Sequence, residues 1–150
     1  MKARLKPVGE QVIVITGADS GIGLATARLA ARRGAAVMLS SRNAEALERI
    51  ADEMNAAGAR VEWYAGDVAD EHAMHTLAAR AFEAFGRIDT WVNNAGVSIY
   101  GEIEHTPVDD VRRLFDTNYF GVVNGSLAAL PHLRGRGGAL INVGSVLSGV

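Results

Sequence analysis

Short apolar runs alternate with longer segments of helical periodicity along this chain. The apolar runs are rich in β-branched and aromatic residues and predict β-strands at 11–16, 35–40, 60–65, 88–93 and 139–143. The segments between them repeat apolar residues three and four positions apart and predict helices at 20–33, 44–57, 71–85 and about 106–133. We therefore expect strands and helices to alternate along the whole sequence.

Capping residues set the predicted helix ends. Asn43 and Asp70 stand where a side-chain oxygen can accept from the free N–H groups of a first helical turn. Glycines that can adopt a left-handed conformation follow the first three helices, at Gly34, Gly58 and Gly86. The last helical segment opens at Thr106-Pro107, with proline at the first helical position, and a break in it is expected near Asn118.

This alternation predicts an α/β fold with a doubly wound parallel sheet of Rossmann type and helices on both faces. The runs 11–16 and 35–40 are continuously apolar, as strands buried on both faces are. Ligands bind such sheets beyond the carboxyl ends of the strands. The chemistry is therefore expected after the last residues of the five strands: Thr16, Ser40, Ala65, Asn93 and Val143.

A glycine-rich segment joins the first predicted strand to the first helix. Gly17 permits a tight turn, Gly21 lets the backbone approach a pyrophosphate, and Gly23 lets the helix lie close to the sheet. A glycine-rich turn without a ligand is the alternative, but the position between a buried strand and a helix favours nucleotide binding. The candidate loop also includes Thr16, Ser20 and Ile22.

The spacing T-G-x-x-x-G-I-G resembles the fingerprint of the short-chain dehydrogenase/reductase family. Further segments match that family in the same order, each at the expected strand or helix: Gly66-Asp67-Val68, Asn93-Asn94-Ala95-Gly96, Asp116-Thr117-Asn118 and Asn142-Val143-Gly144-Ser145. The resemblance implies one truncated NAD(P)-binding domain over residues 1–150, with no second domain. It also implies hydride transfer between a nicotinamide cofactor and a small-molecule carbonyl or alcohol.

The resemblance assigns cofactor contacts to two of these segments. Asp67 would meet the adenine, with the backbone of Val68 beside it. Asn93 would tie neighbouring strands together, and the backbone at Asn94, Ala95 and Gly96 would line the ribose. Asp67 has a plainer alternative as the cap of a turn.

The resemblance also assigns catalytic roles to Ser145 and Asn118. Ser145 would donate a hydrogen bond to the reacting oxygen, and Asn118 would hold a water in a proton relay. As alternatives, Asn118 could mark a helix kink and Ser145 could be an ordinary loop hydroxyl, with Ser148 as a competitor.

One family element is missing from the sequence. The Tyr-x-x-x-Lys pair should lie a short distance beyond Ser145, and the tyrosines present, Tyr64, Tyr100 and Tyr119, are not followed four residues later by lysine. We therefore expect the N-terminal portion of a longer enzyme, inactive without that pair. A non-catalytic dinucleotide-binding module is the alternative. A methyltransferase is less favoured, because such an enzyme needs an acidic residue after the second strand, where this chain has Ser41 and Arg42.

Cofactor preference depends on the residues after the second strand. NAD-binding proteins place an acid there for the ribose hydroxyls, and this chain has Ser41 followed by Arg42. The guanidinium of Arg42 can pair with a 2′-phosphate, which favours NADP over NAD. Arg42 could instead be a solvated residue before the helix, and the negative charge of Asp19 nearby weakens the case.

Composition narrows the remaining possibilities. The 150 residues carry a formal net charge of −2, which gives no reason to expect nucleic acid or an anionic membrane as a partner. Cysteine is absent, and His72 and His75 stand on a polar helix face without a third ligand, so no metal site is predicted. No apolar stretch is long enough to span a membrane. We expect a cytoplasmic protein that forms a homo-oligomer at full length.

Overall fold

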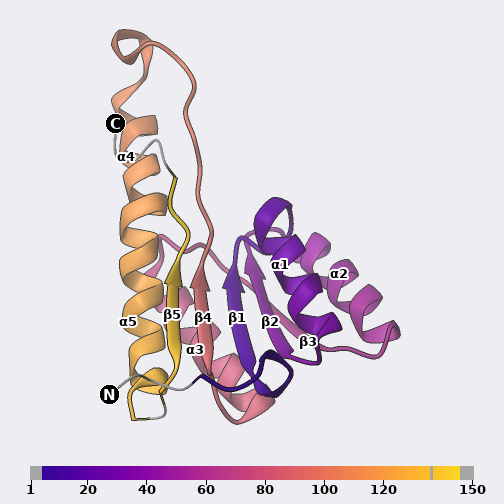
Figure 1. Cartoon of the computed structure of the whole chain (residues 1–150). Coiled ribbons are helices and arrows are strands. Elements are labelled where there is room, and N and C mark those ends of the chain that lie inside the picture. The colour runs from indigo at the N-terminus through magenta and orange to yellow at the C-terminus, as the bar shows by residue number, and fades with distance from the viewer. Residues whose placement is uncertain (1–4, 136, 146–150) are drawn as a thin grey trace.

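A computed structural model describes residues 5–135 and 137–145 of the chain. Its strands form one parallel sheet in the order β3-β2-β1-β4-β5 (Figure 1). The strands are β1 (Val12–Thr16), β2 (Ala36–Ser41), β3 (Arg60–Ala65), β4 (Thr90–Asn93) and β5 (Ala139–Asn142). The predicted α/β fold class is therefore confirmed, with strand bounds that differ by at most two residues from those predicted.

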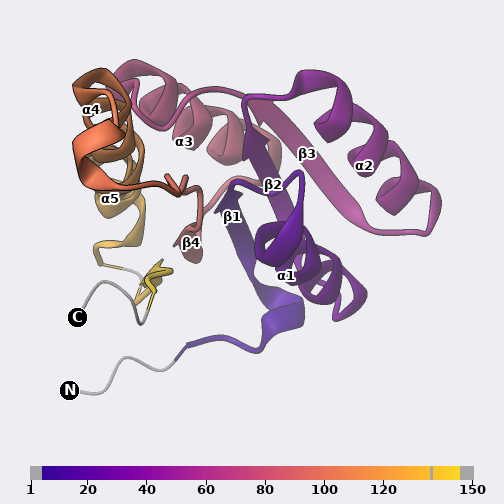
Figure 2. The ribbon, with the colours of Figure 1, turned by 90° about the horizontal axis from the view of Figure 1, so that it is seen from above.

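Helices cover both faces of this sheet. Helices α1 and α2 lie on one face, and α3 and α5 lie on the other (Figure 2). Their bounds are α1 (Gly21–Arg32), α2 (Ala44–Ala56), α3 (Glu71–Phe85), α4 (Val108–Phe115) and α5 (Gly121–Leu133), with short 3₁₀ turns at Val8–Glu10 and Ile103–His105. Over residues 5–135 and 137–145, no helix has both the length and the hydropathy needed to cross a membrane.

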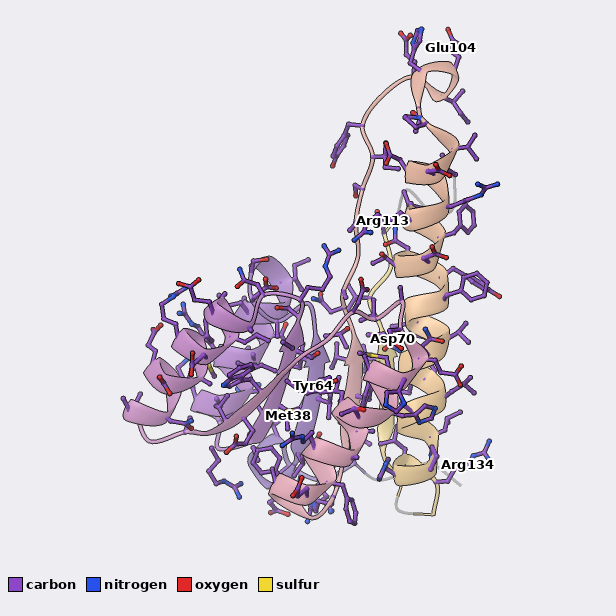
Figure 3. All side chains as sticks on the ribbon, turned by 180° about the vertical axis from the view of Figure 1, so that it is seen from behind. Met38, Tyr64, Asp70, Glu104, Arg113 and Arg134 are labelled. Carbon is purple, nitrogen blue, oxygen red and sulfur yellow. The ribbon has the colours of Figure 1, made fainter. Side chains whose placement is uncertain are left out.

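Two hydrophobic cores result from the alternation of side chains along the buried strands. Ile15 and Leu39, both fully buried, pack against α1 and α2. Their neighbours Val14 and Met38 point to the opposite face, where they pack with Trp91 beneath α3 and α5. Figure 3 labels Met38 on the sheet beside α3 in the view of that face. Each such fully buried side chain stabilises the fold by about 1.5–3 kcal/mol.

The predicted caps are present. Asn43 Oδ1 accepts from the N–H of Ala46 at 3.1 Å, and Asp70 Oδ1 accepts from the N–H of His72 at 2.8 Å. The glycines expected after the first three helices have positive φ angles of 92°, 88° and 74°, at Gly34, Gly58 and Gly86. These ends are determined locally, which is why the sequence predicts them.

Two details of the last helical segment differ from the prediction. Pro107 precedes α4, whose first residue is Val108, so the predicted helix start is one residue early. Near Asn118 the segment does not break. Residues Asp116–Phe120 form a π-helical turn, in which the N–H of Gly121 bonds to the carbonyl of Asp116, and this turn joins α4 to α5. The segment extends from near Glu104 to Arg134 (Figure 3).

Asp89 links β1 to β4 at the amino ends of the strands. Its side chain is 10% exposed and accepts from Lys6 Nζ at 2.9 Å, Arg87 Nε at 2.7 Å and the N–H of Val12 at 2.9 Å. Burial by itself raises the pKa of Asp89, but the hydrogen bonds from Arg87, Lys6 and Val12 outweigh it and hold the pKa below its ordinary value. The ionised carboxylate is thus part of the folded state.

We expect Asp89→Asn to lower the free energy of unfolding by about 1–3 kcal/mol near neutral pH, because it removes a charged acceptor from three donors. The folded-state pKa lies below the unfolded value, so the contribution of Asp89 is present above the unfolded value and is lost as the pH falls through the folded pKa. Urea unfolding at about pH 7 and pH 3 measures this dependence. A stability difference between wild type and variant that stays constant over this range would contradict the assignment.

Candidate functional site

A cavity of about 600 Å³ lies beyond the carboxyl ends of β1, β2, β3 and β4. This is the edge of the sheet at which the sequence places the chemistry. All predicted cofactor-binding residues except Thr16 and Gly23 line the cavity: Gly17, Ser20, Gly21, Ile22, Ser41, Arg42, Asp67, Val68, Asn94, Ala95 and Gly96. The structure thus brings together side chains from four separate segments of the chain.

The sequence analysis did not assign to cofactor binding several residues that also line this cavity. Each of them adjoins a predicted residue or motif in the sequence, and that adjacency is the only signal that could have found them. They are Asp19, Asn43, Gly66, Val97 and Thr117.

Thr16 holds together two of the loops that line the cavity. It is 1% exposed, and its hydroxyl accepts from the backbone N–H groups of Asn94 at 3.0 Å and Ala95 at 3.1 Å. The Asn94 amide in turn donates to the carbonyls of Thr16 at 3.0 Å and Gly17 at 3.1 Å. These reciprocal bonds fix the glycine loop against the turn that follows β4.

Gly23 allows α1 to approach this linked pair of turns. A Cβ atom at position 23 would meet the carbonyl oxygen of Gly17 and would lie 2.5 Å from Asn94 Nδ2. No side chain fits there without displacing backbone. The sequence predicts that Gly23 lets α1 lie close to the sheet; the close approach in the structure is to the glycine loop and Asn94.

Gly21 is the first residue of α1 and faces open space. Its φ angle is +51°, and a Cβ atom built there would have no heavy atom within 4 Å. The free N–H groups and the positive end of the helix dipole therefore adjoin an empty part of the cavity. That arrangement suits an anionic group such as a pyrophosphate.

Two charged side chains stand at the other end of the cavity. The guanidinium of Arg42 is 55% exposed and lies 4.0 Å from Asp67 Oδ2. Asp67 Oδ1 accepts from the N–H of Ala69 at 3.0 Å, so Asp67 caps a turn as well as lining the cavity. Ser41, at the position where an acid would favour NAD, accepts from the N–H of Asn43 at 3.1 Å.

The predicted catalytic residues do not line the cavity. Asn118 holds one wall of it, because its side chain accepts from the N–H of Val97 and donates to the carbonyl of Val97, both at 2.8 Å. Ser145 follows β5 and is exposed. Asn93, at the end of β4, donates to Asn142 Oδ1 on β5 at 2.9 Å, so it ties these neighbouring strands together as the resemblance implies.

Known proteins are similar in sequence to this chain. A family model described as short chain dehydrogenase matches residues 11–150. An uncharacterized oxidoreductase of Bacillus subtilis (strain 168), YxnA, is 51% identical over 147 residues, which are 97% of this chain and 41% of that protein.

Solved structures share its fold. A short chain dehydrogenase/reductase from Burkholderia phymatum in complex with NAD matches with a TM-score of 0.90 and 35% identity, over 95% of this chain and 51% of that one. An alcohol dehydrogenase from the archaeon Thermococcus sibiricus complexed with 5-hydroxy-NADP matches with a TM-score of 0.84 and 33% identity, over 88% of this chain and 57% of that one. The chain spans about half the length of these relatives.

We expect Gly21→Ala to weaken the binding of a nicotinamide dinucleotide by about 10- to 100-fold, because the added methyl group would take space beside the helix N-terminus; this loss is as large as that of one charge-assisted hydrogen bond. Gly21 lines the cavity, and the added methyl group would meet no heavy atom of the protein within 4 Å. The left-handed φ angle also costs about 1–2 kcal/mol of stability. Gly86→Ala is the matched control, since Gly86 has a φ angle of 74°, open space around its Cβ position and no place in the cavity.

Fluorescence titration with NADPH and urea unfolding of both variants separate binding from strain. Equal stability losses with a binding loss only in Gly21→Ala are expected. Unchanged affinity in Gly21→Ala would show that no ligand group approaches this glycine.

Proposed function

The chain belongs to the short-chain dehydrogenase family, and from this we propose that the whole protein is an NADP-dependent oxidoreductase of the carbonyl reductase or alcohol dehydrogenase type. One observation carries the proposal: the cavity beyond the parallel strands contains the start of α1, where Gly21 leaves open space. When bound there, NADP(H) would supply or accept the hydride exchanged with a small-molecule carbonyl or alcohol.

The residues of the cavity suit the parts of a dinucleotide. The N-terminus of α1 and Gly21 would receive the pyrophosphate. The backbone at Ala95 and Gly96 would line a ribose, and Asp67 with the backbone of Val68 would receive the adenine. All of these positions line the same cavity, so one extended ligand can reach them together.

Arg42 supports NADP over NAD. The acidic carboxylate within reach of Arg42, that of Asp67, lies 4.0 Å away and is itself partly exposed, so the guanidinium keeps donors for a further anion. Ser41 carries no charge that would repel a 2′-phosphate. Because the two solved structures above carry an NAD and an NADP-type ligand, the proposal rests on the residues of this chain.

Ser145 and Asn118 would serve the reaction in different ways. Ser145 would donate a hydrogen bond to the reacting oxygen and so stabilise charge that develops there. Both polar atoms of the Asn118 side chain are bonded to Val97. A relay water would therefore bind the main-chain carbonyl of Asn118, or a lone pair or N–H that its side chain still has available.

The general acid that the resemblance implies is the tyrosine of a Tyr-x-x-x-Lys pair. No tyrosine in the chain is followed four residues later by lysine. That observation favours the second candidate function for the 150 residues taken alone, a dinucleotide-binding module without turnover. Assembly as a homo-oligomer and a cytoplasmic location stay predictions from the sequence.

We expect Arg42→Ala in the whole protein to weaken NADPH binding by about 1.5–3 kcal/mol, the value of a hydrogen bond to a charged group, and to leave NADH binding nearly unchanged. Calorimetric titration with both cofactors measures this difference. Arg80→Ala is the control, because Arg80 is exposed on α3 and does not line the cavity. Equal losses for NADPH and NADH in Arg42→Ala would show that Arg42 does not contact the 2′-phosphate.

We also expect the 150 residues on their own to lack reductase activity. General acid catalysis typically contributes about 10²–10⁴-fold to the rate, and no residue here is in place to protonate a developing alkoxide. NADPH oxidation with a panel of ketones and aldehydes is the measurement. Turnover by the 150-residue chain would contradict the roles assigned to Ser145 and to the missing tyrosine and lysine.

A further inference from the structure

The loop after β3 forms one wall of the cavity and depends on other elements for its position. Gly66, Asp67 and Val68 line the cavity. The loop leaves the sheet with the N–H of Gly66 bonded to the carbonyl of Ser41 at 2.9 Å, which holds it beside the end of β2. Bonds within the loop, from the N–H of Asp70 to the carbonyl of Asp67 and from the N–H of Ala69 to Asp67 Oδ1, follow, and the loop then contacts α5.

Asn124, on α5, supplies that contact. Its side-chain amide donates to the carbonyl of Val68 at 3.0 Å and to the carbonyl of Ala69 at 3.2 Å. One NH₂ group therefore holds two consecutive carbonyls, which sets the orientation of both peptide groups. Asn124 does not line the cavity, so any effect on a ligand passes through the loop.

The helix and the loop are in close contact at this point. A Cβ atom at Gly121, one turn before Asn124, would lie 2.6 Å from Val68 Cγ2. Val68 is 8% exposed and packs in the core beneath α3 and α5. The loop can therefore neither move toward α5 nor, while the Asn124 bonds persist, move away from it.

The consequence reaches the ligand through Asp67. Its carboxylate accepts from the N–H of Ala69, so a shift of the Ala69 peptide moves the carboxylate as well. We propose that Asn124 is a positioning residue for the adenosine end of the dinucleotide, which it places by holding the carbonyls of Val68 and Ala69. This inference rests on the proposed function, because the adenosine end is assigned to this loop.

A second asparagine provides a matched control. Asn55, on α2, donates to the carbonyl of Val61 at 2.9 Å and accepts from the N–H of Val61 at 2.9 Å. It thus ties a helix to a backbone segment as Asn124 does, but it contacts the beginning of β3 and does not line the cavity. Its loss should lower stability without changing the loop after β3.

The test compares Asn124→Asp with Asn55→Asp in the whole protein. Aspartate keeps the shape of asparagine but presents an acceptor to carbonyl oxygens. By calorimetric titration, Asn124→Asp should weaken NADPH and adenosine 2′,5′-bisphosphate by about five- to tenfold, as expected for one or two lost hydrogen bonds, and leave nicotinamide mononucleotide unchanged. In turnover, KM for NADPH should rise while kcat stays constant. Asn55→Asp should leave the affinities for all these ligands unchanged.

Asn124→Ala removes the same bonds without adding a charge and replaces Asn124→Asp if the latter does not fold. Wild-type affinity for adenosine 2′,5′-bisphosphate in the folded variant, or an equal loss for nicotinamide mononucleotide, would overturn the inference and leave the proposed function intact. If the wild-type protein binds neither NADPH nor the bisphosphate, the proposed function fails and this inference fails with it.

Discussion

The reciprocal bonding of Thr16 and Asn94 is the constraint on which the rest of the site depends. Thr16, at the end of β1, accepts from two N–H groups of the turn after β4, and Asn94 in that turn donates back to two carbonyls of the glycine loop. The glycine loop and the turn after β4 both line the cavity and contact each other there. These bonds extend the pairing of β1 with β4 beyond the ends of the strands and fix the two loops relative to each other.

Neutral groups also hold the other walls of the cavity. Asn118 bonds to the backbone of Val97, and Asn124 bonds to the backbone of Val68. Amides and hydroxyls can be partly buried at small cost when they are hydrogen-bonded, whereas buried charges carry a large desolvation penalty. Uncharged side chains therefore hold the walls of the cavity in place. The side chain of Arg42 stays 55% exposed beside the cavity.

The sequence predicts what is local, and the structure adds what is distant. Strands, helices and caps follow from periodicity and from single residues such as Asn43 and Asp70, because these signals act within one or two turns. Most of the cavity follows from motifs at strand ends.

Contacts between distant parts of the chain are not predictable from the sequence. The role of Asp89 is one example, because its partner Val12 lies 77 residues away. The role of Asn124 is another, because Asn124 lies 56 residues from Val68. The predicted start at Pro107 is one residue early, and the segment near Asn118 continues through a π-helical turn instead of breaking.

Most of the bonds that hold the cavity end on peptide carbonyls and N–H groups, which every residue type except proline supplies in full. The path of the chain around the cavity therefore depends on the few side chains that make these bonds, such as Asn94, and not on Arg42. Exchange of the lining residue Arg42 leaves these bonds in place. Members of this family can thus diverge in cofactor preference while the scaffold stays the same, and a structure with bound NAD and one with bound 5-hydroxy-NADP both match this chain, with TM-scores of 0.90 and 0.84.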